Sequence, residues 1–588
     1  MNPVPRLSRW RSVLQLLRAE MTPYVRIRLA EVLFLVVLGA VMNALAPLAL
    51  KWIVDGLTGQ GHIPLSAGIL IGLYAFSQWL ARASTEVRAL RFARAERRIL
   101  RTMSERMFAH VLRLPLRFHL SRQTGALSQT IDNGLEGVRM ILHHLVFTVL
   151  PVGAELAVAA VILARLDQPV FLVLFCAAAV CYAVLFGRSA GRISASAREA
   201  AAARVSAGAV ITDGLLNYET VKSFGAEGLI AGKAARALER SERAWLTFHR
   251  RYTSNGLAVA GVFALFLTAT LLYALRDVQA GGLTVGGFVL VNTYMLQLVR
   301  PAEMLGFAVQ GFAHGAALLE KALGLFAEPP ETAGGERLER SARGALEFER
   351  VTLAYGAGRA ALEEVSFTLA AGSTLGIVGQ SGSGKSSIVR LVLRLLEPDA
   401  GAIRLDGTPL AQIAPAALRA AIAVVPQDTV LFDDSIAYNI AVAWPQAGRE
   451  DIERAARLAQ LDEFVRSLPE GYDTVVGERG VRLSGGERQR IAIARAALRR
   501  PLIYVFDEAT AALDGRTEEA VLVSLRALSR SATTLLIAHR LASVMHAERI
   551  VVLHGGRVVE SGAHATLLRA GGHYAALWHA QQPGAAAA

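Results

Sequence analysis

The glycine-rich stretch GQSGSGKS at 379–386 constrains the fold of this chain more than any other feature. It fits the pattern GxxxxGK[ST], in which glycines let backbone N–H groups surround phosphates while the lysine reaches the outer ones. This pattern needs a strand before it and a helix after it. A weak β pattern at 346–353, an apolar segment at 373–378 and a helix expected over 385–396 supply that order. The sequence therefore predicts a nucleotide-binding α/β domain in the C-terminal part of the chain.

Further residues fit the needs of phosphoryl transfer, which depends mainly on positioning and charge stabilisation. Lys385 is expected to hold the β and γ phosphates, and Ser386 and Asp507 to bind Mg²⁺. Asp507 follows the apolar strand LIYVF at 502–506, which places its carboxylate at the sheet edge that faces the phosphates. Glu508 is then the candidate general base for the attacking water. The alternative interpretation of this acidic pair is a solvated turn after a strand.

The pentapeptide LSGGE at 483–487 indicates which kind of nucleotide-binding domain this is. Together with GQSGSGKS and the acidic pair, it resembles the nucleotide-binding domain of ABC proteins. The resemblance implies that the signature peptide of one subunit closes over ATP held by the other, so the functional unit contains two such domains. Ser484, Gly485 and Gly486 precede a helical run, and a helix N-terminus can bind the partner's γ-phosphate.

The same resemblance assigns roles to three further residues. Gln427 in VPQD matches the Q-loop, which senses Mg²⁺ and water and contacts the membrane domain, and His539 in IAHR matches the switch histidine that contacts γ-phosphate. The segment AALD at 511–514 matches the D-loop, with Ala511 where the family commonly has serine. With the key side chains present, both sites of a homodimer are expected to hydrolyse ATP.

Tyr355 is a candidate for stacking on adenine, with an ordinary strand tyrosine as the alternative. The residues expected to bind ATP are Tyr355, Gly379, Ser381, Gly382, Ser383, Gly384, Lys385, Ser386, Ser387, Ser484, Gly485, Gly486, Glu487 and Asp514. The residues expected to bind Mg²⁺ are Ser386, Gln427 and Asp507. The residues expected to act in catalysis are Glu508, His539 and Gln427.

The first half of the chain is apolar enough to span a membrane. Of the 588 residues, 53% are hydrophobic, and the long uncharged runs lie before residue 310. A run of about 20 apolar residues can cross a bilayer as a helix. Six such spans are predicted, at 29–50, 65–87, 141–164, 168–190, 255–276 and 283–310. Arginines cluster before the first span and after the second, which places both flanks in the cytoplasm.

The two cytoplasmic connections, after the second and fourth spans, are about fifty residues long and rich in Ala, Arg, Glu and Leu. This composition favours helices that continue beyond the bilayer as stalks. A short extended piece at 113–119 and a turning segment at 213–222 are expected at the stalk tips.

The predicted fold is thus an α-helical six-span transmembrane domain, like that of type IV ABC exporters, followed by an α/β P-loop nucleotide-binding domain. The predicted boundaries are 1–28 for an N-terminal cytoplasmic or elbow segment, 29–325 for the transmembrane domain, 326–344 for a linker, 345–575 for the nucleotide-binding domain and 576–588 for an Ala-rich tail.

Charge and cysteine content argue against other classes of protein. The net charge of +13 comes from basic residues beside apolar spans, so retention on the cytoplasmic side explains it without a nucleic-acid partner. Cys176 and Cys181 lie in an apolar run without metal or disulfide spacing. The Arg-rich N-terminus allows a mitochondrial transit peptide, but a cytoplasmic elbow helix, and with it a bacterial inner membrane, is favoured.

Three stretches narrow the resemblance further: RFHLSRQTG at 117–125, DGLLNYETVKSF at 213–224 and LTVGGFVLVNTYMLQL at 283–298. They look like the Atm-type branch of ABC exporters, the mitochondrial and bacterial half-transporters related to heavy-metal-tolerance exporters. The likeness covers nearly the whole chain. It implies a homodimer in a lipid membrane, using ATP and Mg²⁺, that exports glutathione-related or thiol/metal-conjugate solutes.

The chain departs from the family pattern where that pattern provides ligands for glutathione. Val259 and Val262 stand where the family has Asn and Gln on the fifth span, and Gln310 stands where it has Arg on the sixth; Met304 is retained. Export of lipid-like, drug-like or peptide solutes is the alternative. A nucleic-acid-associated ABC ATPase, which six spans disfavour, and an ATP-gated conductance are rival functions.

Polar residues inside spans are costly and are functional candidates by default. Arg300 and Glu303 share one helical face, where they either contact substrate or form a structural ion pair. For Arg188 and Arg192, anchoring on the cytoplasmic side is favoured over attraction of an anionic solute. Glu155 is expected to bond to a neighbouring helix, with the lining of a cavity as the alternative. The substrate candidates are Gln297, Arg300, Glu303, Met304, Gln310, Arg188 and Arg192.

Overall fold

The computed structural model describes residues 21–59, 66–122, 124–165, 169–297, 299–331, 334–338, 341–355, 360–477, 480, 483–509, 515–530 and 532–581. The expected elbow segment before residue 21 lies outside these residues. The chain forms two compact units. The first comprises Met1–Leu112 and Arg122–Pro329, and the second comprises Arg113–Ser121 and Pro330–Ala588.

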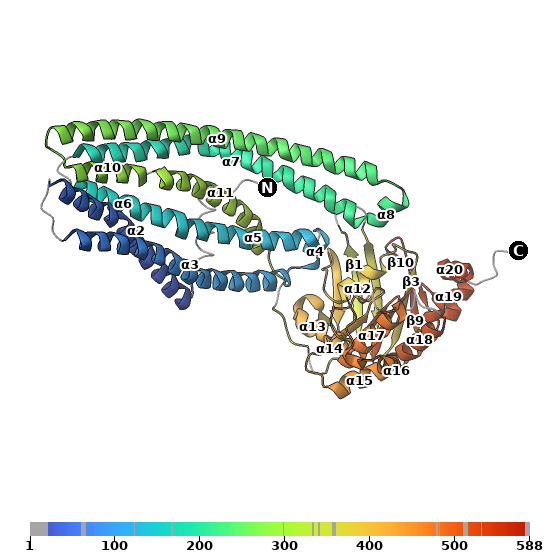
Figure 1. Cartoon of the computed structure of the whole chain (residues 1–588). Coiled ribbons are helices and arrows are strands. Elements are labelled where there is room, and N and C mark those ends of the chain that lie inside the picture. The colour runs from blue at the N-terminus through green and yellow to red at the C-terminus, as the bar shows by residue number, and fades with distance from the viewer. Residues whose placement is uncertain are drawn as a thin grey trace. The chain divides into compact units, whose positions relative to one another are not determined.

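The first unit is built from long helices (Figure 1). They are α2 (Pro23–Thr58), α3 (Ala67–Val111), α5 (Thr124–His144), a π-helical turn (Leu145–Val149), α6 (Leu150–Ala164), α7 (Pro169–Leu216), α9 (Glu227–Gln279), α10 (Val285–Gln297) and α11 (Val299–Ala327). Thr22 caps the first of these, because its hydroxyl accepts a hydrogen bond from the Val25 N–H at 3.4 Å.

Four helical segments in the described part of the chain are long and apolar enough to cross a membrane: Pro23–Thr58, Leu127–Ala164, Pro169–Ser189 and Glu227–Gln279. They contain the predicted first, third and fifth spans and all but the end residues of the predicted fourth span, 168–190. The predicted second and sixth spans are helical, in α3 and in α10 with α11, but they do not reach the same hydropathy and length. α3 carries Arg82 and Glu86 inside the predicted second span, and α10 has 13 residues.

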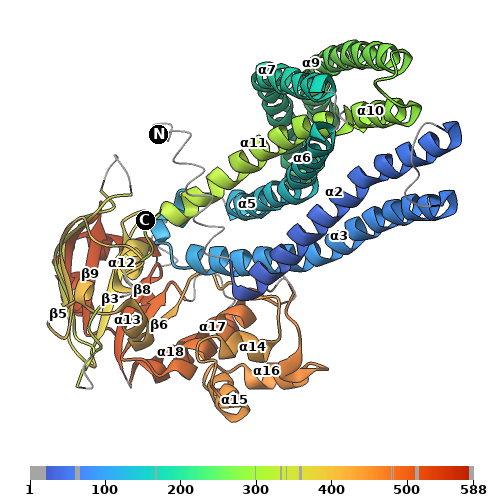
Figure 2. The same ribbon diagram turned by 90° about the vertical axis from the view of Figure 1, so that its left-hand side faces the viewer.

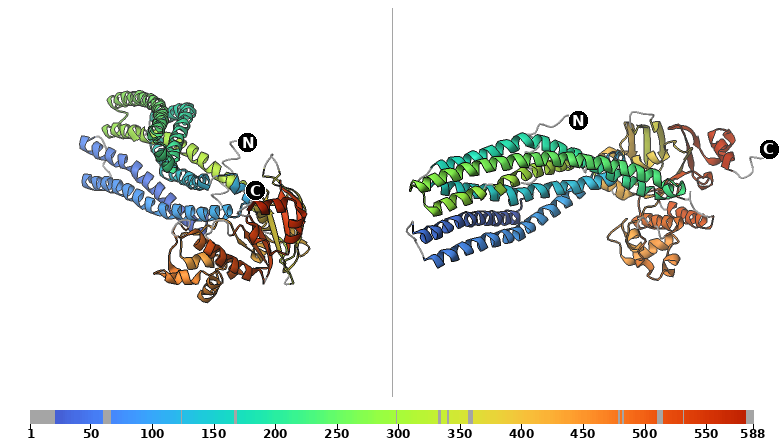
Figure 3. Two further views of the ribbon diagram at one scale, coloured as in Figure 1. Left: turned by 90° about the vertical axis from the view of Figure 1, so that its right-hand side faces the viewer. Right: turned by 45° about the horizontal axis from the view of Figure 1, so that its top comes forward.

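The stalk prediction is confirmed in its main feature, the continuous helices. α3, α7 and α9 have 45, 48 and 53 residues. At about 1.5 Å per residue each is roughly twice as long as the ~30 Å hydrocarbon core. α2 and α3 lie side by side in Figure 2, and α7 and α9 run together along most of their length in Figure 3.

The stalk tips differ from the expectation at one point. The piece at 113–119 is not extended, because Leu116–Leu120 forms the short helix α4. Pro115 precedes α4, and its carbonyl accepts a hydrogen bond from the Phe118 N–H at 3.0 Å. Phe118 is buried, and Leu116 packs against the core of the second unit. The second tip turns at the short helix α8 (Tyr218–Ser223).

Within the first unit, Glu155 binds a neighbouring helix, as predicted. The side-chain amide of Asn43 in α2 donates to the Glu155 carboxylate at 3.2 Å. A carboxylate in an apolar environment needs such a partner.

The second unit holds two sheets. The mainly parallel one has six strands in the order β10-β9-β3-β8-β7-β6, and the antiparallel one has four in the order β2-β1-β4-β5. The strands are β1 (Leu346–Leu353), β2 (Leu362–Leu369), β3 (Thr374–Gly379), β4 (Ala400–Leu405), β5 (Thr408–Pro409), β6 (Ile422–Val425), β7 (Ile503–Asp507), β8 (Thr533–Ala538), β9 (Arg549–His554) and β10 (Arg557–Gly562). The predicted strand at 346–353 is therefore confirmed.

Helices complete this unit: α12 (Lys385–Val392), α13 (Pro415–Ala421), α14 (Ile436–Ala441), α15 (Arg449–Leu458), α16 (Asp462–Ser467), α17 (Gly485–Arg499), α18 (Gly515–Ser529), α19 (His564–Ala570) and α20 (His573–Gln581). The helix expected over 385–396 ends earlier, at Val392, because the backbone of Arg394 is left-handed (φ 50°). At the other end, α20 runs to Gln581, beyond the expected boundary at 575.

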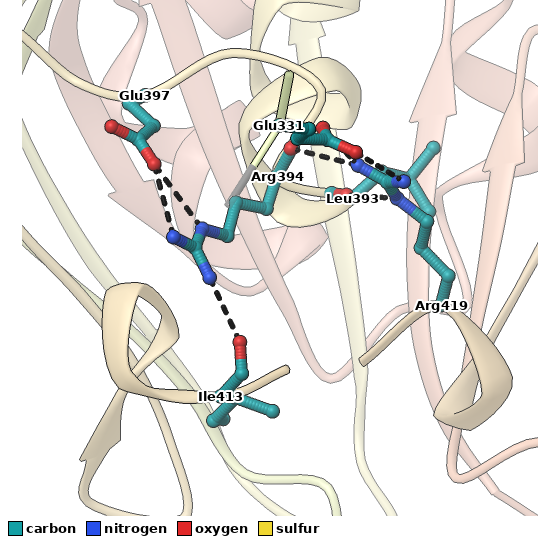
Figure 4. A network of polar contacts seen from close by, with 6 residues as sticks. All are labelled: Glu331, Leu393, Arg394, Glu397, Ile413 and Arg419. Atoms are coloured by element: carbon teal, nitrogen blue, oxygen red, sulfur yellow. Dashed lines mark hydrogen bonds and ion pairs between the residues drawn. The ribbon is translucent and has the colours of Figure 1, made fainter. Parts of the chain in front are cut away.

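Glu331, in the expected linker, is bound to the rest of the second unit at two points. Two guanidinium nitrogens of Arg419 bind the Glu331 carboxylate at 2.9 and 2.5 Å, and Arg419 also donates to the carbonyls of Leu393 and Arg394 (Figure 4). The Glu331 N–H donates to the Arg113 carbonyl at 2.7 Å. Glu331 thus connects the first stalk tip to α13 of the second unit.

Candidate nucleotide site

The candidate ATPase residues follow four parallel strands that are neighbours in the sheet. β3 ends at the phosphate loop, β8 ends before His539, β7 ends at Asp507, and β6 ends before Gln427. In an open α/β sheet the ligand binds outside the carboxyl ends of the strands. The fold therefore brings together four segments that are far apart in the sequence.

The phosphate loop depends on glycine where a side chain would collide. Gly384 is left-handed (φ 103°), and a Cβ there would lie 2.6 Å from the Ala361 carbonyl oxygen. The Lys385 Nζ donates to the carbonyls of Gly379 and Gln380 at 2.9 and 3.1 Å. It also lies 3.7 Å from the Glu508 carboxylate. Lys385 is 5% exposed, so its charge acts in a poorly solvated place, where the attraction between the ammonium and an anion is stronger than in water.

Asp507 is the most perturbed carboxylate of this site. Burial, and secondly the negative charge of Glu508, raise its pKa to about 6, while Lys385 and Arg390 act in the opposite direction. Its Oδ1 is buried and has no hydrogen-bond partner among the described residues.

A divalent cation fits this arrangement. Mg²⁺ prefers carboxylate and hydroxyl oxygens, which Asp507 and the Ser386 hydroxyl provide. A bound cation would satisfy the buried Oδ1 and would stabilise the charged form of Asp507.

Glu508 is held in an uncommon backbone conformation. Its φ is +49°, in the left-handed region, and its N–H donates to the Ile537 carbonyl at 2.9 Å. Such a conformation in a residue other than glycine costs roughly 1–3 kcal/mol and persists where the surroundings enforce it. The bond to β8 supplies that restraint and sets the direction of the Glu508 side chain. A small cavity beside it is lined by Glu508, His539 and Ser543, among others.

The His539 backbone is held by the C-terminal helix. The Gln581 side chain donates to the His539 carbonyl at 2.7 Å and accepts from the Leu541 N–H at 2.9 Å. The His539 ring is exposed. The sequence analysis did not anticipate Gln581, because a glutamine beside an Ala-rich tail carries no motif.

Gln489, another residue without a motif role, joins the signature helix to the Q-loop. Its side-chain amide donates to the Pro426 carbonyl at 3.1 Å and accepts from the Thr429 hydroxyl at 3.0 Å. Gln489 is 4% exposed, and Gln427, between the two contacts, is exposed. Movement of the Q-loop backbone is therefore coupled to α17.

The signature peptide forms a capping box at the start of α17. The Ser484 hydroxyl accepts from the Glu487 N–H at 3.3 Å, and the Glu487 carboxylate accepts from the Ser484 N–H at 2.7 Å. Gly485 and Gly486 lie in the first turn, whose N–H groups have no acceptor within a helix. The N–H groups of these two glycines are therefore available to an anion, as the predicted signature site requires, and the Ser484 and Glu487 side chains hold the turn.

Tyr355 fits the expected stacking role in exposure and in contacts. Its ring is 50% exposed, and its hydroxyl lies 3.1 Å from the Ser387 hydroxyl and accepts from Arg390 at 2.9 Å. Both partners belong to α12, the helix that follows the phosphate loop. The phenol end is thus fixed while one ring face stays accessible.

A chain of contacts joins the first stalk tip to the backbone beside Tyr355. Arg117 of α4 donates to Asp399 at 2.9 Å, and the other Asp399 oxygen accepts from the Ala354 N–H at 2.7 Å. The Ala354 hydrogen bond and, secondly, Arg117 lower the pKa of Asp399. The neighbour of Ala354 is Tyr355. The stalk tip is therefore two hydrogen bonds away from the candidate adenine-binding residue.

The structure gives less information on the remaining candidate residues. Asp514 and Ala511 lie outside the described residues, and so do the side chains of Arg300, Glu303 and Gln310. Gln297 ends α10, and Met304 is 44% exposed on α11. Arg188 and Arg192 are exposed on α7.

Comparison with known proteins gives the family. The family description "ABC transporter transmembrane region" matches residues 29–302, and "ABC transporter" matches 362–511. An "ATM1-type heavy metal exporter" of Novosphingobium aromaticivorans is 37% identical over 568 residues, which cover 95% of this chain and 92% of that protein. The chain belongs to the Atm1-type family of ABC exporters.

Other relatives agree with this assignment. The "Iron-sulfur clusters transporter atm1, mitochondrial" of Aspergillus fumigatus is 36% identical over 572 residues, covering 95% of this chain and 78% of that protein. A solved "bacterial Atm1-family ABC exporter with ATP bound" has a TM-score of 0.86 and 36% identity, covering 96% and 99% of the two chains.

This Atm1-type exporter is therefore a multi-pass membrane protein that couples ATP hydrolysis to export, as the sequence predicted. Exporters of the family act as dimers on small molecules. Its relatives include bacterial and mitochondrial proteins, so an inner membrane fits in either case.

Proposed function

We propose that two copies of this Atm1-type exporter form a homodimer that exports glutathione-related or thiol/metal-conjugate solutes with energy from Mg²⁺-ATP. The observation that supports the ATPase roles is the meeting of Lys385, Asp507, Glu508, His539 and Gln427 at four adjacent strand ends. The solute class is supported by the resemblance of 117–125, 213–224 and 283–298 to the Atm-type branch, and by relatives named as heavy metal and iron–sulfur cluster transporters.

Each nucleotide would be held by residues of both subunits. Lys385 and the loop N–H groups bind the β and γ phosphates, and the first turn of the partner's α17 binds γ-phosphate from the other side. Mg²⁺ at Ser386 and Asp507 would supply further positive charge against the phosphate oxygens.

Glu508 accepts the proton of the attacking water as the water oxygen bonds to the γ-phosphorus and the bond from that phosphorus to the β–γ bridging oxygen breaks, which releases ADP. His539 orients the γ-phosphate. Closure of the two nucleotide domains on ATP and their separation after hydrolysis would drive alternating access through the stalks. Arg117 and Asp399 are in place to transmit this movement at the first tip.

One observation favours the alternative substrate class. Val259 is 1% exposed and belongs to the apolar cluster of the helical bundle, with Val262 packed against it. These positions therefore offer no polar group to a glutathione-like solute. Lipid-like, drug-like or peptide solutes are the second candidate class for this reason.

ATP hydrolysis by the purified protein in lipid nanodiscs distinguishes the two classes. We expect glutathione, its disulfide, S-conjugates or thiol–metal adducts to stimulate hydrolysis at least twofold, while lipids and apolar drugs do not. The Glu508→Gln variant, which cannot turn over, is the control for background phosphatase. Stimulation by lipids or apolar solutes alone would contradict the proposed solute class and leave the ATPase assignment intact.

A further inference from the structure

A cavity of about 430 Å³ lies within the helical unit, and its described lining residues do not include the substrate candidates Gln297, Met304, Arg188 and Arg192. Its walls come from α5, α7, α9 and α11, all in the first unit. On α7, the lining residues from Ser194 to Arg204 recur every three or four positions, so they form one helical face.

The cavity lies at the cytoplasmic end of the membrane spans. His144 is 20 residues before Ala164, the outer end of its span, which is about 30 Å along a helix and equals the bilayer core. Arg198 lies beyond Ser189, the inner end of the next span. A cytoplasmic solute would therefore meet this cavity before it reached the middle of the bilayer.

The described residues of its lining carry positive charge. Arg198 and Arg204 line it, both are exposed, and neither has an ion pair among the described residues. His144 and His314 line it too, and none of the described lining residues is Asp or Glu. Retention on the cytoplasmic side explains two arginines near a membrane. It does not explain why both face a cavity without a counter-charge.

A buried polar atom in the cavity wall has no partner. The His144 Nδ1 is buried and has no hydrogen-bond partner among the described residues. Its ring lies so close to Gly311 that a Cβ there would be 2.1 Å from the ring atoms. Buried polar atoms are nearly always paired with protein, water or ligand, so this imidazole has a free hydrogen-bonding position.

Three aromatic residues also belong to the cavity lining. Trp245 and Phe248 of α9 and Phe307 of α11 line the cavity, and Trp245 and Phe307 are 38% and 49% exposed. Exposed aromatic faces beside guanidinium groups match a ligand with an apolar, planar part and an anionic end.

We propose that this cavity binds amphipathic organic anions, with Arg198 and Arg204 at the carboxylate or sulfonate and Trp245, Phe248 and Phe307 on the apolar part. The proposal rests on the proposed function, because it names an entry site and a solute class for the same transport route. Such solutes carry an anionic group together with an aryl or similar apolar group.

Two probes that differ in charge test the proposal on the full-length protein in nanodiscs. 4-Iodobenzoate and the neutral 4-iodobenzyl alcohol share an arene, and iodine quenches tryptophan on contact. We expect saturable quenching by the carboxylate with a Kd at least tenfold below that of the alcohol. The saturable part should vanish in Trp245→Phe, which identifies the reporter.

Variants of Arg198 and Arg204 test whether these two guanidinium groups bind the carboxylate of the probe. Arg198→Gln/Arg204→Gln should raise the Kd of the carboxylate at least tenfold, and Arg198→Lys/Arg204→Lys should leave it within about threefold of wild type. Arg240→Gln, an exposed arginine of α9 that does not line the cavity, is the matched control. Equal Kd values for the two probes, or an unchanged Kd in the Gln pair, would overturn the proposal.

Thiol-stimulated ATP hydrolysis on the same samples separates this result from the proposed function. If thiols stimulate hydrolysis but the carboxylate does not bind saturably, the proposed anion binding in the cavity is wrong and the proposed solute class still stands. If the carboxylate binds saturably but thiols do not stimulate hydrolysis, the proposed anion binding still stands and the proposed solute class is wrong.

Discussion

At the scale of single residues, two adjacent carboxylates have different environments. Asp507 is buried with an unsatisfied oxygen and a pKa of about 6, whereas Glu508 stands at a left-handed position 3.7 Å from Lys385. Environments that separate two carboxylates chemically indicate separate roles. The cation-binding and base assignments follow from this difference.

The base assignment predicts the behaviour of Glu508→Gln. The amide keeps the shape of the side chain but cannot accept the proton of the attacking water, so hydrolysis should fall by at least 10²-fold. ATP binding should persist, and a closed dimer should accumulate. Turnover is measured by phosphate release and the dimer by crosslinking. Near-wild-type turnover would contradict the role of Glu508.

The Asp507 environment predicts a pH-dependent stability difference in the protein without nucleotide or metal. A carboxyl whose folded pKa is raised from 3.8 to about 6 favours folding below the unfolded pKa, and this contribution is lost as pH rises through 6. Asp507→Asn removes the buried charge and should raise the unfolding temperature at pH 7.5. The corresponding gain in the free energy of unfolding has an upper limit of about 3 kcal/mol.

The difference should disappear near pH 4, where the wild-type carboxyl is protonated too. Ser386→Ala, which alters the same cation site without a titrating group, should show no such pH dependence. Thermal unfolding between pH 4 and 8, with chelator, measures both variants. A stability gain that is constant with pH would show that the burial of the charge is not its cause.

At the scale of elements, the short helix α4 is part of the nucleotide-binding unit rather than of the helical unit. Leu116 and Phe118 fix it by apolar contacts, and Arg117 adds a polar contact to Asp399. Because Asp399 also holds the Ala354 N–H, a shift of α4 acts on the backbone next to Tyr355. We therefore expect this element to transmit movements of the stalk to the candidate nucleotide site.

This coupling predicts different results for the two ends of the contact. Asp399→Ala frees the Ala354 N–H and should raise the KM for ATP about two- to fivefold.

Arg117→Ala keeps the bond between Asp399 and the Ala354 N–H and should reduce solute-stimulated hydrolysis more than basal hydrolysis. The ion pair is exposed and is itself worth less than about 1 kcal/mol, so stability should change little. Arg122→Ala, on the neighbouring turn, is the control. Equal loss of basal and stimulated hydrolysis in Arg117→Ala would contradict the coupling role.

At the scale of the whole molecule, the signature turn and the phosphate loop of one chain belong to different ATP sites in the proposed homodimer. Lys385 follows β3, whereas Ser484 caps α17. The proposed composite site needs Lys385 from one copy and the α17 N-terminus from the other.

Mixed dimers test this arrangement. When Lys385→Met is in one chain and Gly486→Asp in the other, one site carries both lesions and the other is intact. When both changes are in the same chain beside a wild-type chain, each site carries one lesion. We therefore expect one vanadate-trapped nucleotide per dimer in the first case and almost none in the second. The opposite result would show that each site is formed by a single chain.

The sequence determined the chemistry and the class of this exporter. Phosphate binding needs glycines, lysine and a hydroxyl in fixed local order, and membrane helices need long apolar runs, so both can be read within short windows. For the same reason the strand at 346–353 and the long stalk helices were predictable. The sequence did not reveal the helical form of α4, the early end of α12 at Val392, or the parts played by Gln489, Gln581 and Asp399.

Only the tertiary structure decided these features, because each depends on a partner distant in the chain. Gln489 contacts the Q-loop, Gln581 holds the His539 carbonyl, and Asp399 joins Arg117 to Ala354. The positively charged cavity is a similar case, since Arg198, Trp245 and His144 come from three helices. Local pattern specifies which groups are present, and the packing of distant segments decides which of them meet.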